Sequence, residues 1–352
     1  MIAFRKQHTY PIGLHLGTQT ATLVQLAGAN GKLEVHALAH DEIPCNESAS
    51  AEEQDREVAA ALRKLIADHH FRGRQVVSCL GVQQLFVQNV RLPKLPPEEV
   101  EKVVRWEAEE RLPYPVAEAE MRYLTAGEVR QDANVKQEVI LLACHQGVLN
   151  RHLSLLEMAG LVPASIDVEP CAILRCLHAV GSIEPPPRKA YLHIGERATV
   201  MIIAEGRQVL FLKYISSGSR HLNQATARHL NVPLPEATRI REEASAAMKA
   251  DEPDELQRSV LDGIRTTLES MTTEVELCLR YYKVTFRGQP LTELVLAGGE
   301  ARPWLADFFT DRLGLSCAPA DPFAQLSSPP ATGRGGSGRW ATALGLSLKL
   351  TV

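Results

Sequence analysis

The chain has 352 residues, of which 45% are hydrophobic and 23% are charged, and its formal net charge is -4. This composition is ordinary for a globular protein of two or three domains, and the slightly acidic balance argues against a dedicated nucleic-acid binder. No stretch approaches the ~20 apolar residues that a membrane-spanning helix needs. Seven cysteines without a C-x-x-C pair are typical of reduced thiols in the cytosol.

Two stretches that begin 178 positions apart have similar sequences. One reads L-H-L-G-T-Q-T-A-T-L-V from Leu14, and the other reads L-H-I-G-E-R-A-T-V-M-I from Leu192. Each is an extended apolar run that ends in His-x-Gly, followed by a polar turn and another apolar run. A repeat this long predicts a duplicated domain, because solenoid repeats are much shorter. Glycine after a strand lets backbone amides face an anion, so two facing turns would grip a phosphate chain from both sides.

The first half of the chain alternates extended and helical patterns. Strands are expected at 12–16, 21–26, 33–38, 76–80, 85–90, 120–129, 135–143 and 164–168, and helices at 50–69, 97–112, 146–159 and from 169. The helix at 97–112 begins at the Pro96-Pro97 pair and ends before Pro113. Its apolar face is expected to consist of Val100, Val103, Val104 and Trp106.

A stiff Glu-Pro-Pro-Pro-Arg segment at 184–188 separates the halves. The second half is expected to form a strand meander at 190–215, helices near 219–230, 234–249 and 253–286, and a strand at 291–297. That strand meets Gly298 and Gly299. A helix to about residue 313, a Gly/Ser/Pro loop at 327–338 and a last helix at 340–350 follow.

Five motifs that follow one another in order carry a family resemblance. They are V-V-R-W-E-A-E-E-R-L-P-Y-P (Val103–Pro115), L-E-M-A-G-L-V-P-A-S-I-D-V-E-P (Leu156–Pro170), G-S-R-H-L-N-Q (Gly218–Gln224), L-A-G-G-E-A (Leu296–Ala301) and A-L-G-L-S-L-K (Ala343–Lys349). In this order they resemble the type IV pilus assembly protein PilM family, a relative of the cell-division protein FtsA. The resemblance covers about Ile12 to Lys349.

The resemblance implies an α/β fold of the duplicated actin-like (ribonuclease H-like) ATPase type, with two lobes around a nucleotide cleft. Lobe I would span 1–187, with subdomain IA and a PilM/FtsA-type IC insertion at about 85–145. Lobe II would span 188–352, with subdomain IIA and a helical IIB insertion at about 218–287. The last helix, at about 340–350, would return toward lobe I.

The resemblance also implies an ATP or ADP site. Two phosphate loops and an adenosine loop would form it, comprising Gly17, Thr18, Gln19, Thr20, Gly195, Glu196, Arg197, Thr199, Gly298, Gly299 and Glu300. Arg241 matches a position where the family often has a long cation near the adenine; it would stack on the base or be a solvated helix charge. Glu169 is the one catalytic candidate, because it matches a position that often orients water or the metal shell. A helix-start carboxylate stabilised by the helix dipole is the alternative.

Both phosphate strands depart from the family. The usual D-I-G is replaced around His15 and His193, and the lost aspartates normally hold Mg²⁺ through water. Neutral imidazole is a poor ligand for Mg²⁺, so tight Mg²⁺ binding and efficient ATP hydrolysis are not expected. Three interpretations stay open: local hydrogen bonding in a cleft that has lost catalysis, metal-free nucleotide binding by imidazolium charge, and a transition-metal site that includes Glu169.

By resemblance, the chain would be a cytoplasmic scaffold of a type IV pilus or related secretion machine at the inner face of the inner membrane. It would bind the cytoplasmic tail of a PilN-like bitopic membrane protein in the groove between IA and IC, with Trp106, Leu112 and Tyr114 as candidate contacts. That partner would bring it to the membrane; other machine components and copies of itself are further expected partners. The alternatives are an active actin-like ATPase, a small-molecule kinase, or a cytoplasmic component of type II secretion.

Overall fold

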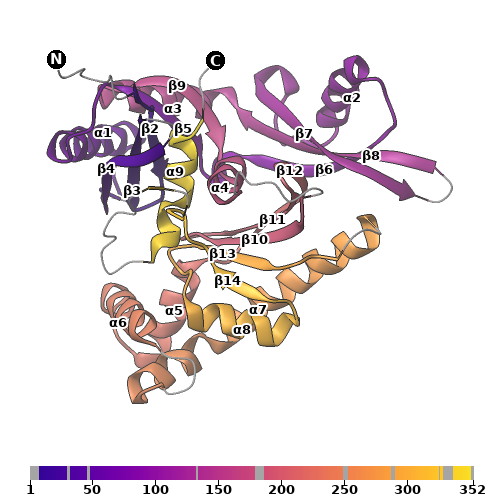
Figure 1. Cartoon of the computed structure of the whole chain (residues 1–352). Helices are drawn as coiled ribbons and strands as arrows, with labels where there is room; N and C mark the ends of the chain where they lie inside the picture. The colour runs from indigo at the N-terminus through magenta and orange to yellow at the C-terminus, as the bar shows by residue number, and fades with distance from the viewer. Residues whose placement is uncertain are drawn as a thin grey trace.

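The structure, a computed structural model, describes residues 8–29, 32–45, 48–131, 134–178, 186–248, 253–286, 290–324, 326–327 and 336–349. Its three sheets are arranged around the central helices α4 and α9 (Figure 1). Most of the loop expected at 327–338 lies outside the described residues.

The first sheet belongs to lobe I and has the strand order β1-β3-β2-β5-β9, with β4 paired to β3. Its strands are β1 (His8–Thr9), β2 (Ile12–Leu16), β3 (Thr20–Ala29), β4 (Lys32–Glu42), β5 (Gln75–Leu80) and β9 (Val162–Val168). Alternation along β2 buries Ile12 and Leu14 against α1 (Ala51–Asp68) and α3 (Gln146–Met158). On the other face Gly13 lies against α9 (Ala341–Ser347), which packs beside α4 (Glu169–Leu177).

The second sheet, β6-β8-β7, forms the inserted IC subdomain. Its elements are η1 (Val82–Gln84), β6 (Phe86–Pro93), α2 (Pro97–Glu109), η2 (Val116–Glu118), β7 (Ala119–Gln131) and β8 (Asn134–His145). Val100, Val104 and Ala108, spaced four apart, bury one side of α2 against this sheet. Trp106 lies about 200° around the helix from Val104 and is 57% exposed, so the expectation that it shares the apolar face is wrong.

The third sheet belongs to lobe II and has the order β12-β11-β10-β13-β14. Its strands are β10 (Arg188–Ile194), β11 (Thr199–Glu205), β12 (Gln208–Ile215), β13 (Leu294–Gly298) and β14 (Cys317–Pro319). The helical elements of this lobe are α5 (Ser219–Leu230), α6 (Leu234–Ala247), α7 (Glu255–Phe286) and α8 (Pro303–Leu313), and η3 (Ser337–Trp340) precedes α9. The apolar row of α7, from Ile264 to Cys278, packs on one face of the sheet.

The sequence repeat is preserved in the strand register. In lobe I, His15 pairs with Thr22 across the antiparallel pair β2–β3. In lobe II, His193 pairs with Val200 across β10–β11, so both partners lie 178 positions further on. The first strand of each set then pairs in parallel with a later strand, β2 with β5 and β10 with β13. The two lobes therefore share one core topology.

The IC subdomain is fastened to lobe II by a polar network. Arg91 on β6 donates to Glu138 on β8 at 3.0 Å and to the Tyr281 hydroxyl on α7 at 3.0 Å. Tyr281 donates to the second oxygen of Glu138 at 3.0 Å. Glu138 is 1% exposed, and its charge is balanced by Arg91. Beside the network, Ile140 and Leu142 share an apolar cluster with strands β10 to β12.

Within the described ranges, no helix combines the length and the hydrophobicity that crossing a bilayer requires. All seven cysteines are free thiols, as their number and spacing predicted.

Candidate functional site

Two loops of equivalent geometry follow β2 in lobe I and β10 in lobe II. The Gly17 N–H donates to the Thr20 carbonyl at 2.8 Å, and the Gly195 N–H donates to the Ala198 carbonyl at 3.0 Å. These are the two loops that the sequence predicts to contact phosphate. The second loop is also held from outside, since the Ser219 N–H at the start of α5 donates to the Gly195 carbonyl at 2.9 Å.

Glu169 brings the two histidines together. It is the first residue of α4, and its Oε1 lies 3.4 Å from His15 Nε2 and 3.5 Å from His193 Nε2. The side chains of Glu169 and His193 are 10% and 5% exposed, whereas that of His15 is 22% exposed. The sequence-predicted candidates therefore converge on one carboxylate oxygen between the lobes.

The electrostatics of this cluster favour an ionised carboxylate. Burial raises the pKa of Glu169, but the hydrogen bond from His15 and the charge interactions with His193 and His15 outweigh it, so the pKa is lowered. Burial lowers the pKa of His193 more than the Glu169 charge raises it, and its Nε2 faces the carboxylate. The opposite nitrogen, His193 Nδ1, is buried and has no hydrogen-bond partner among the described residues.

The residues present do not fit Mg²⁺, the ion implied by the fold family. Mg²⁺ requires near-octahedral oxygen ligands, and this cluster offers one carboxylate that two imidazoles already contact. Among the described residues, no group of three or more His, Cys, Asp or Glu side chains is arranged to hold a metal ion. The transition-metal interpretation of His15, His193 and Glu169 is therefore not supported.

The predicted adenosine loop lies at the end of β13, beside β10. Gly298 has φ +92°, and a Cβ there would overlap the Ile194 carbonyl, so only glycine fits this turn. A Cβ on Gly299 would meet no atom within 4 Å, which leaves open space beside the turn.

Arg241 is 1% exposed, so the expectation of a solvated helix charge is wrong. Its guanidinium donates to both Glu300 oxygens, at 2.8 and 2.7 Å, and to Asn223 Oδ1 at 2.5 Å. Burial raises the pKa of Glu300, but the Arg241 charge and hydrogen bonds outweigh this and lower it. In this arrangement Arg241 fixes the position of the Gly298–Glu300 turn; its stacking on a base stays a prediction.

The candidate partner contacts occupy three different environments. Leu112 is half-buried against the IC core, and Trp106 is exposed. Tyr114 packs edge-to-face on His145, with ring centroids 5.3 Å apart. Because His145 caps the N-terminus of α3, Tyr114 lies where IC joins subdomain IA.

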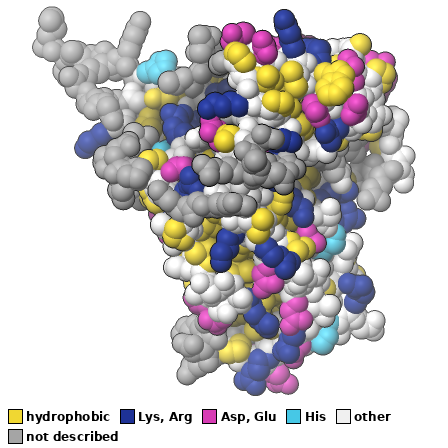
Figure 2. Space-filling model, turned by 90° about the vertical axis from the view of Figure 1, so that its right-hand side faces the viewer, with side chains coloured by type: hydrophobic (Ala, Val, Ile, Leu, Met, Phe, Trp, Pro, Cys, Tyr) yellow, Lys and Arg dark blue, Asp and Glu magenta, His cyan; other side chains and the backbone are white. Residues whose placement is uncertain are grey.

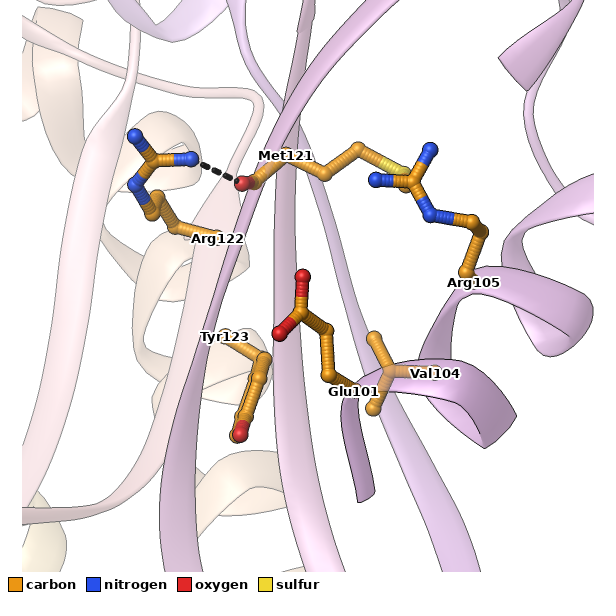
Figure 3. A pocket seen from close by; sticks show the side chains of 6 residues that line it. All are labelled: Glu101, Val104, Arg105, Met121, Arg122 and Tyr123. Carbon is orange, nitrogen blue, oxygen red and sulfur yellow. Dashed lines mark hydrogen bonds between the residues drawn. The ribbon is translucent and has the colours of Figure 1, made fainter. Parts of the chain in front are cut away.

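A pocket of about 310 Å³ lies between α2 and β7. Glu101, Val104 and Arg105 line it from the helix, and Met121, Arg122 and Tyr123 line it from the strand (Figure 3). Sequence analysis missed the pocket because it depends on how a helix and a strand pack. On the same side of the molecule, hydrophobic side chains gather near the top among acidic and basic ones (Figure 2).

Comparisons with known proteins agree with this architecture. Residues 13–350 match the family described as type IV pilus assembly protein PilM. The structure is similar to the "PilM-PilN type IV pilus biogenesis complex" at 26% identity and a TM-score of 0.78, covering 96% of this chain and 98% of that one. It is also similar to the ethanolamine utilization protein EutJ from Carboxydothermus hydrogenoformans (16% identity, TM-score 0.56, 96% and 89% covered).

The duplicated topology and these matches agree on the actin-like ATPase fold, with two lobes meeting at Glu169. The family match extends over nearly the whole chain, including the IC insertion and the last helix. The chain therefore belongs to the type IV pilus assembly protein PilM family.

Proposed function

We propose that this protein is a scaffold of a type IV pilus or related secretion machine, and that it binds the cytoplasmic tail of a PilN-like inner-membrane protein. Its family membership and its similarity to a protein solved in a complex with PilN support this function. In this proposal the bitopic partner holds the chain at the cytoplasmic face of the inner membrane, where it also meets other machine components.

The observation that carries the proposal is the open surface of the IC subdomain. The pocket between α2 and β7 combines the apolar side chains of Val104 and Met121 with charges of both signs from Glu101 and Arg105. Trp106, on the same helix, is 57% exposed. An exposed tryptophan on a helix that lines a hollow with a charged rim is typical of surfaces that bind a peptide.

We expect the tail to bind in an extended conformation, because the described part of the sheet next to the pocket has an unpaired edge. Within the described strands β7 pairs on one side only, with β8. An extended peptide gains affinity from backbone pairing with such an edge, and specificity from pockets that take alternate side chains.

Peptide binding tests the proposal directly. A fluorescein-labelled synthetic peptide of the PilN-like cytoplasmic tail should bind the wild type, and Trp106→Ala or Tyr123→Ala should weaken binding by roughly tenfold or more. Leu256→Ala is the matched control, because Leu256 is 50% exposed on α7 in lobe II. Unchanged affinity in both IC variants would exclude this surface as the tail site.

We further propose that the cleft binds ATP or ADP without Mg²⁺ and does not hydrolyse ATP efficiently. The equivalent loops at Gly17 and Gly195 and the open space beside Gly299 support nucleotide binding. An active ATPase or kinase would need carboxylates around the metal, and here Glu169 is already contacted by two imidazoles. Calorimetry with ADP in EDTA and in Mg²⁺ should give equal affinities; a strict Mg²⁺ requirement or rapid phosphate release would contradict this.

A further inference from the structure

The short helix η3 lies between the two lobes. It contacts β13 of lobe II and β3 of lobe I. Gly338 lies so close to the adenosine turn that a Cβ there would be 2.5 Å from the Gly298 carbonyl oxygen. On the other side, Trp340 packs edge-to-face on His40 of β4, with ring centroids 6.0 Å apart. Arg339, between these two anchored residues, is therefore held at the boundary between the lobes.

Arg339 is a half-buried cation with one unpaired hydrogen-bond donor. Its Nε atom is buried and has no hydrogen-bond partner among the described residues. Burial lowers its pKa, Glu242 raises it, and Arg302 lowers it further. Glu300 also lies near, but its carboxylate already accepts two hydrogen bonds from Arg241.

The Arg339 charge also acts on His40 of lobe I. Burial and then the Arg339 charge lower the pKa of His40 to about 4, against the weaker effect of Asp41, and His15 lowers it further. His40 is thus neutral near pH 7, with its Nδ1 2.8 Å from Thr22 Oγ1.

A second arginine at the cleft has the same unsatisfied atom. Arg197 belongs to the loop that ends β10, and its Nε is buried without a hydrogen-bond partner in the described part of the chain. β10 pairs with β13 up to Ile194 and Gly298, so this loop and the turn against which η3 packs lie at one edge of the sheet. Buried polar atoms are rarely left unpaired, so two such guanidinium nitrogens at one edge point to a missing anion.

We propose that Arg339, together with Arg197, binds the phosphate groups of a metal-free nucleotide and supplies the charge that Mg²⁺ supplies elsewhere in this fold. This inference rests on the nucleotide binding proposed above and assigns its charge balance to named residues. Guanidinium suits the role, because its planar donors match phosphate oxygens and it stays charged when buried.

Calorimetry with two probes, ADP and inorganic pyrophosphate, tests the inference in EDTA. The wild type should bind both, and Arg339→Gln should weaken both by about tenfold or more, the effect of losing a charged hydrogen bond. Arg339→Lys keeps the charge but loses the planar donors, so its affinity should lie between the two. Arg312→Gln is the control, because Arg312 is half-exposed on α8 and pairs with Glu269 away from this turn.

The outcomes separate this inference from the nucleotide proposal. Pyrophosphate binding without ADP binding would support the arginine site and contradict the nucleotide site. ADP binding that Arg339→Gln and Arg197→Gln leave unchanged would support the nucleotide site and overturn this inference. Binding of neither probe by the folded wild type would overturn both.

The titration of His40 gives a readout that a purely structural role of Arg339 would not change. Because the Arg339 charge lowers the pKa of His40, pyrophosphate bound to Arg339 should raise it in the wild type, and Arg339→Gln should raise it without ligand. Histidine NMR titrations would measure both effects, and equal melting temperatures of the wild type and Arg339→Gln would show that the variant is folded. A His40 pKa that pyrophosphate leaves at about 4 would contradict the inference.

Discussion

His15 and His193 direct their Nε2 atoms to the same oxygen of Glu169, from 3.4 and 3.5 Å. One histidine belongs to each lobe, and the carboxylate stands at the start of the helix between them. A single side chain therefore joins equivalent positions of the duplicated fold, at the point where the family usually has two aspartates.

Restoring both aspartates should restore metal dependence. His15→Asp combined with His193→Asp would place three carboxylates together, which repel one another unless a cation is bound. The double variant should melt a few degrees lower than the wild type in EDTA and recover in millimolar Mg²⁺. The matched double Asn variant removes the imidazoles without adding charge, so Mg²⁺ should not change its melting temperature. Identical melting curves for the Asp variant with and without Mg²⁺ would show that the cleft cannot be re-formed in this way.

Burial of His152 should make the protein acid-sensitive. The ring is 7% exposed, its Nε2 lies 3.1 Å from Ser78 Oγ, and burial lowers its pKa to about 4. Because the folded pKa lies below the unfolded value of ~6.5, the unfolded state takes up the proton first. Stability present above pH ~6.5 is therefore lost as the pH falls toward 4, by up to ~1.4 kcal/mol per pH unit.

Urea unfolding at pH 7, 6 and 5 measures this slope. His152→Gln retains a hydrogen-bonding side chain that does not titrate. The free energy of unfolding of this variant should therefore fall less steeply with pH than that of the wild type, by the slope that one proton contributes. His40, whose pKa is also lowered to about 4, contributes equally in both proteins. Equal slopes for the two proteins would mean that His152 does not remain neutral in the folded state.

Breaking the Arg241–Glu300 pair should be more harmful than removing it. Glu300→Gln leaves the guanidinium of Arg241 buried at 1% exposure without its anion, at a cost of about 3–5 kcal/mol. Arg241→Met combined with Glu300→Leu removes both charges and should be destabilised less. Chemical denaturation of the wild type, of Arg241→Met, of Glu300→Leu and of the double variant gives the coupling energy. A double variant as unstable as the sum of both single variants would contradict a buried ion pair.

The Tyr281 hydroxyl should hold the IC subdomain against lobe II. Tyr281→Phe removes the hydrogen bond to Glu138 and the acceptor for Arg91, with an expected loss of about 1–3 kcal/mol. Hydrogen exchange should then rise in β6 and β8, where Arg91 and Glu138 lie, while lobe I stays protected. Tyr10→Phe, in lobe I, is the control. Exchange unchanged in β6 and β8 would show that apolar packing alone docks the subdomain.

Much of this fold could be predicted from the sequence because the same strand–turn–strand motif occurs in both halves of the chain. The His-x-Gly repeat predicts two equivalent strand–turn–strand units, and the pairs His15–Thr22 and His193–Val200 have the register that the repeat requires. Helices with strong periodicity and clear ends, such as α1 with its Ser50 capping box, were predicted to within about two residues. Short strands such as β14 were missed, because three residues carry no periodic pattern.

The site could be predicted only in part. Glycine turns and the two histidines have sequence signals, and the structure brings His15 and His193 to one carboxylate. Trp106 was wrongly assigned to the apolar face of α2, because it follows the apolar residues Val103 and Val104 in the sequence. The buried side of α2 consists instead of residues spaced four apart. Arg339 was missed since the environment of its unpaired Nε atom depends on the packing of η3 between two lobes and not on its neighbours in sequence.

The equivalent loop closures at Gly17 and Gly195 have a consequence for the orientation of a molecule bound between them. Two walls related by duplication look alike to a guest between them, and by themselves they would accept it in either of two reversed poses. Only elements that occur once can break that ambiguity, and here they are Glu169 at the start of α4 and Arg339 in η3. One of them is a carboxylate and the other a guanidinium, so an anionic guest would be repelled by the first and attracted by the second, which would set its direction.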